Sequence, residues 1–253
     1  MHLVAILISA LVLQASGGRT LESSREETQA VAIEGSQIFR KAFEFEKTSA
    51  TGFVLERLLE LERVIRQENN SSGPLVAKQD EEIRRLVSQV LDLESIGNFA
   101  LGRHYQPLQE TELGKKRYAE YISVFRRLVE ENYLESARRY LGGNHEISFR
   151  SETKTVVREE SFEIVEASIR QPDVDLVLQF FVVQEEGKRK IVDIRLDATS
   201  LRETYRGSFN RIINPRVREA KNQEEGRMAG LSELIEAMSN RLAELQSGGA
   251  TRL

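Results

Sequence analysis

Apolar and polar side chains alternate between Asp173 and Asp197, which predicts two strands joined by a turn at Gly187. Every second residue of the first strand is large and apolar, so one side of it forms a continuous apolar wall. The wall consists of Val174, Leu176, Leu178, Phe180 and Val182. Such a surface requires a cover, either the protein's own helices or those helices with an apolar ligand between them.

Four strands are predicted, and the short connections between them indicate an antiparallel meander. They span Glu146 to Val157, Ser161 to Arg170, Asp173 to Gln184 and Lys190 to Asp197. The predicted turns lie at 158–160, at Gln171-Pro172 and at 185–188.

Apolar residues spaced three and four apart predict helices on both sides of these strands. The clearest runs from Lys115 to Tyr140 and is ended by Gly142-Gly143. Pro215 is predicted to interrupt the helix that follows the strands. A less regular spacing also favours a helix over Ala30 to Glu46. The remaining apolar segments are Thr51 to Gln67, Asp80 to Leu93, Asp92 to Tyr105, Ser200 to Ile213 and Leu231 to Leu245.

The order of these elements predicts an α+β fold in which a mostly antiparallel four-stranded sheet is covered on one face by several helices. We expect an apolar pocket where the sheet curls away from the helices.

Composition and charge narrow the classes of function. The formal net charge of -4 and the pI of about 5.7 provide no overall positive field, so we expect no nucleic-acid partner. The chain has 0 cysteines, which excludes disulfides, thiol catalysis, Cys-ligated zinc and a lipid-anchored lipoprotein N-terminus.

Residues Met1 to Gly17 resemble a secretory signal peptide. The segment Leu3 to Leu13 is apolar apart from Ser9, and it is shorter than the roughly 20 residues of a membrane-spanning helix. Small residues at Ala15-Ser16-Gly17 place the expected cleavage after residue 17, although the n-region has no Lys or Arg. An uncleaved anchor and a misassigned start codon are the alternatives. We expect an exported protein.

Candidate catalytic groups are few. Beyond His2, the chain has only His104 and His145, and neither has a second ligand at metal-binding spacing, so no metal is expected. We expect His104 to pack beside Tyr105 at a helix end. Asp193 and Asp197 alternate with apolar residues, which is typical of the solvent-facing side of a strand. With no nucleophile elbow, phosphate loop or dinucleotide fingerprint, we predict no catalytic residues and no enzyme.

Two linked motifs resemble the MlaC family, also called toluene-tolerance auxiliary proteins. The first is L-G-R-H-Y at 101–105, followed by Y-x-x-x-F-R-R-L-V-x-x-N-Y at 121–133. The second is V-D-I-R-L-D-A-T-S-L-R-E-T-Y-R-G-S-F at 192–209. Departures from the family pattern are Ala198 and Thr199 in place of Gly-Val, a lengthened tract from Glu110 to Lys116, and no counterpart for 30–48.

The resemblance implies a soluble periplasmic phospholipid carrier that contributes to outer-membrane lipid asymmetry. Its implied partners are phospholipid, an inner-membrane MCE-domain protein with its ABC transporter, and an outer-membrane lipoprotein complex. The implied cargo is the only bound small molecule, and no cofactor is expected. The expected domains are a signal peptide at 1–17, an N-terminal extension at 18–50, a lipid-binding domain at 51–247 and a tail at 248–253.

The acyl chains are expected between the strand wall and the covering helices. Arg206 of the family's Y-R pair is expected to meet either a lipid phosphate or a carboxylate on a neighbouring helix, and we favour the ion pair. For any one lining residue, ordinary core packing is the competing interpretation. The expected lipid-binding residues are Ile96, Phe99, Leu101, Tyr105, Phe125, Val129, Tyr133, Val174, Leu176, Leu178, Phe180, Val182, Tyr205 and Phe209.

Two other functions are compatible with the same pattern. An enzyme on an α+β cone would require a polar group with a shifted pKa deep in the pocket. An adaptor protein would have a closed core behind the strand wall.

Overall fold

The computed structural model describes residues 31–34, 39–68, 74–140, 146–157, 160–170 and 175–247. The predicted signal peptide and the C-terminal tail lie outside these residues. So do the expected helix end at Gly142-Gly143, the turn at Gln171-Pro172, and the residues His145 and Val174.

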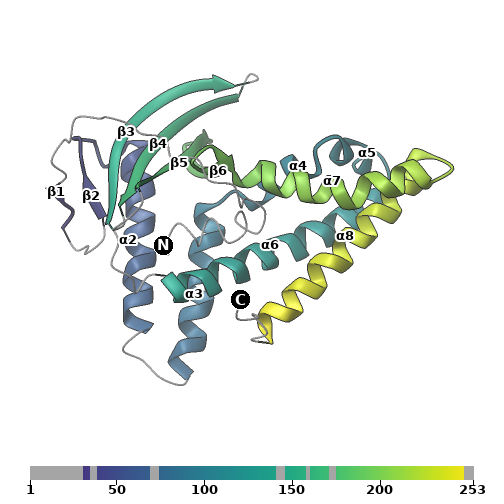
Figure 1. Ribbon diagram of the computed structural model, residues 1–253, viewed down its shortest axis with the longest axis horizontal. Helices are drawn as coiled ribbons and strands as arrows, with labels where there is room; N and C mark the ends of the chain where they lie inside the picture. The colour runs from purple at the N-terminus through teal and green to yellow at the C-terminus, as the bar shows by residue number, and fades with distance from the viewer. Residues whose placement is uncertain are drawn as a thin grey trace.

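The predicted meander is confirmed by the four long strands β3 to β6 (Figure 1). Consecutive strands pair antiparallel, and Glu186 and Gly187 form the turn between β5 and β6 with positive φ angles of 48° and 76°. The long strands are β3 (Glu146–Val157), β4 (Glu160–Arg170), β5 (Asp175–Glu185) and β6 (Lys188–Leu196).

The sheet is larger than the four strands predicted. In the described part of the chain it has seven strands in the order β1 to β7. The helix predicted over Ala30 to Glu46 is wrong, because Phe39 is fully buried and its strand pairs in parallel with β3 opposite Ile147. This distant partner overrides the local pattern. The additional strands are β1 (Val31–Ala32), β2 (Phe39–Lys41) and β7 (Thr199–Ser200).

The predicted helices are present, with shifted ends. The segment expected from Asp92 to Tyr105 divides after Leu101 into a 3-10 turn and a short helix. The helices are α2 (Ala50–Glu68), α3 (Pro74–Val90), α4 (Leu93–Leu101), η2 (Gly102–His104), α5 (Tyr105–Leu108), α6 (Glu112–Tyr140), α7 (Leu201–Glu219) and α8 (Gln223–Gln246).

Pro215 does not interrupt α7, contrary to the prediction. Helix α7 continues past it because α8 packs closely alongside. A Cβ added at Gly230 of α8 would lie 2.8 Å from the Cα of Ile213, and one at Gly226 would lie 2.6 Å from the Cα of Val217. The two glycines therefore allow a close approach that supports α7 on both sides of the proline.

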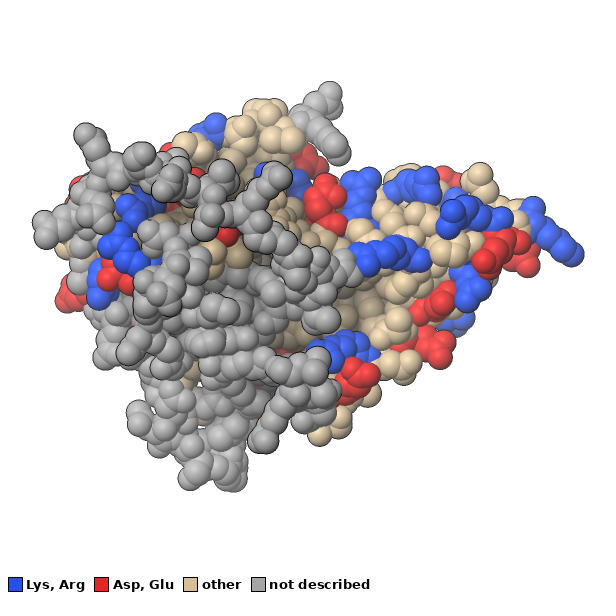
Figure 2. Space-filling model, in the orientation of Figure 1, with Lys and Arg blue, Asp and Glu red and all other residues tan. Residues whose placement is uncertain are grey.

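The sheet lies at one end of the molecule, and α7 and α8 extend away from it to the opposite end (Figure 1). Helices α2, α3 and α4 contact the strands from one side. Leu91, at the end of α3, forms a β-bridge to Ile191 of β6. Charged residues of both signs are interspersed over the α7–α8 arm (Figure 2). Helices α2, α3 and α4 cover one face of the sheet, which we call the inner face.

Candidate functional site

The predicted strand wall lies on the inner face. Leu178, Phe180 and Val182 are at most 1% exposed, and Leu176 is half-buried. On the other side of β5, Val177 is 39% exposed. Further along this second side, Phe181 is 2% exposed and packs with Phe162 and Val192 in a separate, smaller cluster. The period-two pattern therefore placed the wall residues on the inner face correctly.

The neighbouring strands continue the wall, and the sequence analysis did not include them. In β4, Val165 lies opposite Phe180 and Ala167 lies opposite Leu178, so their side chains share the inner face. Alternation within β4 was the available signal. The further buried residues of this face are Ile147, Phe149, Ile169, Ile191 and Ile194.

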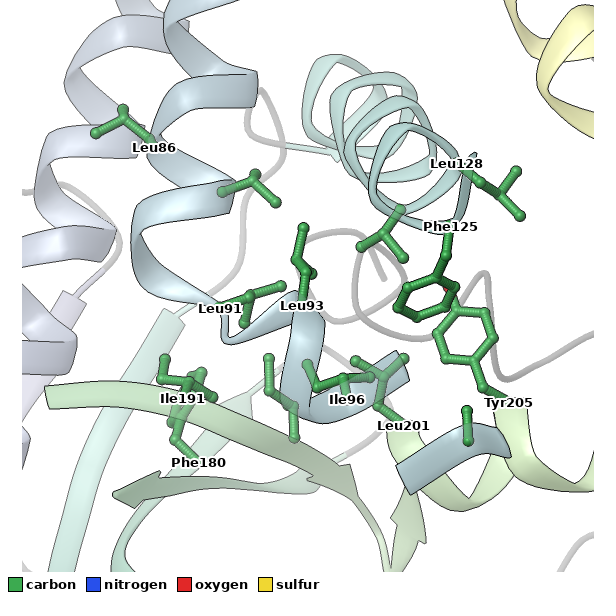
Figure 3. Packing of buried hydrophobic residues seen from close by; sticks show 14 of the residues in the cluster. Leu86, Leu91, Leu93, Ile96, Phe125, Leu128, Phe180, Ile191, Leu201 and Tyr205 are labelled. Carbon is green, nitrogen blue, oxygen red and sulfur yellow. The ribbon is translucent and has the colours of Figure 1, made fainter. Parts of the chain in front are cut away.

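Most of the predicted helical residues meet the wall in one apolar cluster (Figure 3). The rings of Phe125 on α6 and Tyr205 on α7 lie 5.1 Å apart, edge to face, and Phe209 lies 5.9 Å from Phe125. Edge-to-face contacts of this kind fix ring orientation. The predicted helical residues found in or against the cluster are Ile96, Leu101, Tyr105, Phe125, Val129, Tyr205 and Phe209.

Two predicted residues are not placed in this cluster. The ring of Phe99 lies beneath two guanidinium groups, with Arg202 4.3 Å and Arg206 5.1 Å from its centre. Phe99 therefore makes cation–π contacts with two arginines instead of packing in the main apolar cluster. The side chain of Tyr133 lies outside the described part of the structure.

Arg206 does not form the expected ion pair with any described carboxylate. Its guanidinium lies over Phe99 and against the backbone of Gly102, where an added Cβ would come within 3.1 Å of the Arg206 Nε. Gly102 has φ 53° and ψ -125°, a conformation that side-chain-bearing residues rarely adopt. The two sequence motifs therefore touch, because the glycine of L-G-R-H-Y accommodates the arginine of the Y-R pair.

At the end of the inner face where α2 begins, polar residues replace the apolar ones. The Glu152 carboxylate accepts from the backbone N–H of Thr51 at 2.8 Å and from its hydroxyl at 2.7 Å. Arg189 donates to Glu163 from Nε at 2.7 Å and from Nη2 at 3.3 Å, and from Nη1 to the carbonyl of Thr48 at 2.7 Å. We call these five residues the α2 clasp, because they join the start of α2 to β3, β4 and β6.

Hydrogen bonding lowers the pKa of both carboxyl groups in the α2 clasp. Burial by itself raises the pKa of Glu152, but hydrogen bonds from Thr51, Ser49 and Ala50 together outweigh it, and the net shift is downward. The bonds from Arg189 lower the pKa of Glu163 despite partial burial. Both groups are therefore ionised at neutral pH.

His104 is buried and hydrogen-bonded to another side chain of the protein. It is 3% exposed, and its Nε2 lies 3.1 Å from the Oδ1 of Asn214 on α7. Burial lowers the pKa of His104, and the nearby Arg103 and Arg227 lower it further. This geometry agrees with the structural role that the sequence predicted for His104.

Asp193 is not solvent-facing, which corrects the interpretation drawn from its alternation. It is 0% exposed and accepts from the hydroxyl of Ser200 at 2.8 Å and from the backbone N–H of Arg202 at 3.1 Å. These donors lie at the start of α7, so Asp193 fixes that helix to β6. Asp197 is exposed, as expected, and accepts from the backbone N–H of Val177 at 2.9 Å.

Within the described ranges, no group of three or more His, Asp or Glu side chains is arranged to hold a metal ion. Among the helices of those same ranges, none has the length and apolar character to cross a membrane.

Comparison with known proteins identifies a family and a shared fold. A model of the MlaC protein family matches residues 59–224, more than half of the 253-residue chain. A solved structure of a phospholipid-binding protein from Ralstonia solanacearum, in complex with a phospholipid, is 18% identical, with a TM-score of 0.56. That match covers 78% of this chain and 99% of the other and shows a shared fold. No curated protein matches. The chain belongs to the MlaC family.

Proposed function

We propose that this protein is a phospholipid carrier whose acyl chains lie between the inner face of the sheet and the helices. The observation that carries the proposal is the apolar inner face, which has no charged side chain on β4 and β5 from the pair Ile169 and Leu176 to the pair Val165 and Phe180. Glu163 of the α2 clasp lies opposite Val182, the next residue of the wall. Charged groups begin only at the α2 clasp. The phospholipid bound to the Ralstonia solanacearum protein of the same fold supports the assignment of the cargo.

The energetics require an enclosed site. Each CH₂ removed from water contributes about 0.8 kcal/mol, so two chains of about fifteen carbons amount to roughly 24 kcal/mol. A shallow groove would leave much of the acyl-chain surface in water, and much of this free energy would be lost. The proposed lining is the strand wall, including Val174, together with the predicted helical residues other than Phe99, which lies beneath Arg202 and Arg206. These are Ile96, Leu101, Tyr105, Phe125, Val129, Tyr133, Tyr205 and Phe209.

A carrier role agrees with the other features of the chain. We propose that the segment 1–17 directs export to the periplasm, where the protein exchanges lipid between an outer-membrane lipoprotein complex and an inner-membrane MCE-domain protein with its ABC transporter. Charges of both signs on the α7–α8 arm would favour rapid docking and release (Figure 2). The phospholipid is cargo, and no cofactor is required.

A binding protein is favoured over an enzyme. The strongest catalytic candidate, His104, is bonded to Asn214 and lies away from the strand wall on η2. A second buried ionisable group, Asp193, accepts hydrogen bonds from residues at the start of α7. Neither is free to act on a molecule held at the inner face.

The first test is purification of the full chain from a periplasmic extract, followed by mass spectrometry under denaturing conditions. We expect phospholipid at a fixed ratio to protein, and transfer of labelled phospholipid between vesicles by the purified protein. A stable, lipid-free protein that transfers no lipid would overturn the proposal.

A substitution in the wall distinguishes the carrier from a closed-core adaptor. We expect Leu178→Trp to retain its fold and lose bound lipid, because the ring occupies space that the acyl chains need. In a closed core the same ring would destabilise the fold by about 1–3 kcal/mol. The matched control is Val177→Trp on the outer side of β5, where the side chain is 39% exposed and lipid content should not change.

A further inference from the structure

Tyr205 has a buried hydroxyl group that no described residue satisfies. Its side chain is 8% exposed, and the hydroxyl oxygen is buried without a hydrogen-bond partner. The ring is held by Phe125 at 5.1 Å and Phe209 at 5.7 Å, and it extends from α7 toward α6 (Figure 3). The hydroxyl group is therefore held in a fixed direction inside the apolar cluster.

The neighbouring tyrosines of the same aromatic group are satisfied. The Tyr121 hydroxyl donates to the carbonyl of Gly97 at 2.9 Å, and the Tyr118 hydroxyl donates to the Oδ1 of Asn98 at 2.6 Å. A buried hydroxyl without an acceptor destabilises a fold, and phenylalanine would fill the same space without that penalty. A tyrosine at position 205 therefore indicates an acceptor that the described residues of the chain do not supply.

The surroundings of this hydroxyl define the chemistry of the acceptor. Burial raises the pKa of Tyr205, so the phenol is a protonated donor at neutral pH. The side chain of Asn132 on α6 lies near enough to lower the pKa of Tyr205, against the effect of burial. It lies outside hydrogen-bond geometry with the Tyr205 hydroxyl, so it does not satisfy this group. An anionic phosphate is strongly disfavoured at such depth, whereas a neutral carbonyl oxygen is tolerated when it accepts a hydrogen bond.

We propose that the Tyr205 hydroxyl donates a hydrogen bond to an ester carbonyl at the top of an acyl chain, and so sets the position of the lipid in the site. This inference rests on the proposed function. In a glycerophospholipid, the ester carbonyls are the neutral acceptors nearest to the apolar chains. Tyr205 would thereby make the site selective for ester-linked over ether-linked lipids.

The test compares a diacyl phosphatidylethanolamine with its dialkyl ether analogue of the same chain length. The delipidated full-length protein is loaded from vesicles containing both, and the bound lipids are measured by mass spectrometry. We expect the wild type to retain the diester roughly 2- to 10-fold better, which is the range of one hydrogen bond. In Tyr205→Phe the ratio should fall to one. The control Tyr121→Phe, whose hydroxyl bonds to Gly97, should keep the wild-type ratio.

A second measurement excludes a folding defect as the cause. Delipidated Tyr205→Phe should unfold at the same or a higher temperature than the delipidated wild type, because the variant removes an unsatisfied donor. Equal retention of both lipids by the wild type, or the same ratio in wild type and Tyr205→Phe, would overturn the inference and leave the carrier function standing. Binding of neither lipid by the wild type would overturn the proposed function itself.

Discussion

At the scale of single residues, the contact between Gly102 and Arg206 explains why two segments a hundred residues apart share one family signature. Gly102 adopts φ 53° and ψ -125°, and the guanidinium of Arg206 lies on its backbone. Any Cβ at this position would meet both a disfavoured backbone conformation and the arginine. Leu101-Gly102 and Tyr205-Arg206 thus act as one unit that joins α4 to α7.

This contact predicts the effect of Gly102→Ala on stability. The disfavoured conformation alone should lower the free energy of unfolding by about 1–3 kcal/mol, and the Cβ placed 3.1 Å from Arg206 Nε should lower it further. The control is Gly187→Ala, where φ is 76° but nothing lies within 4 Å of an added Cβ. Urea denaturation should give the larger loss for Gly102→Ala. Equal losses would show that the contact with Arg206 contributes nothing.

Asp193 shows where residue-level inference from sequence ends. The alternation in this strand correctly placed Asp193 on the outer face of the sheet. A residue on that face is exposed to solvent only where no other element covers it. Here Ser200 and Arg202, at the start of α7, cover the carboxylate. The pattern of one strand does not reveal which later helix folds back over it.

At the scale of elements, the α2 clasp holds the start of helix α2 to the sheet through polar contacts. Both carboxyl groups have a folded-state pKa below the ordinary value of 4.5. A depressed folded-state pKa contributes stability that is fully present above the unfolded-state pKa and is lost as pH falls through the folded-state pKa. The clasp therefore stabilises the protein at neutral pH and weakens below about pH 4.5.

We predict that Glu163→Gln lowers the free energy of unfolding at pH 7 by about 1 kcal/mol, because it removes the charge that Arg189 engages at two points. The loss should shrink as pH falls from about 4.5, the ordinary pKa that applies to the unfolded chain, through the lower folded-state pKa of Glu163. Urea denaturation between pH 3 and pH 7 measures both effects. Glu185→Gln, at an exposed position on β5, is the control. A deficit that is the same at every pH would exclude the ionised pair as its source.

Element prediction succeeded where the local period decides the structure and failed where a distant partner decides it. The four long strands and the helix over 112–140 follow from their own spacing. The strand at Phe39 depends on Ile147, more than a hundred residues away. Likewise, the continuity of α7 past Pro215 depends on the glycine-mediated contact with α8.

At the scale of the whole molecule, the sequence predicted the wall of β5 but only part of the site around it. The wall residues Leu178, Phe180 and Val182 are buried as expected, because alternation reports a face directly. The unsatisfied hydroxyl of Tyr205 and the placement of Phe99 beneath two arginines were not predictable, because each depends on side-chain geometry between helices. The resemblance pointed to these residues as candidates, and the structure shows which contacts each of them makes.

The proposed carrier must also respond as a whole to removal of its cargo. If acyl chains fill space between the wall and the helices, the lipid binds only the folded protein, and at a free lipid concentration 100 times the Kd it adds about 2.7 kcal/mol to the free energy of unfolding. Stripping the lipid should therefore lower the thermal midpoint, and adding phospholipid back should raise it in proportion to the logarithm of lipid concentration. Leu178→Trp, which should hold no lipid, should unfold near the stripped wild type and not respond to added phospholipid. An identical midpoint for loaded and stripped wild type would mean that the lipid is not enclosed by the fold, because an enclosed ligand cannot leave a folding equilibrium unchanged.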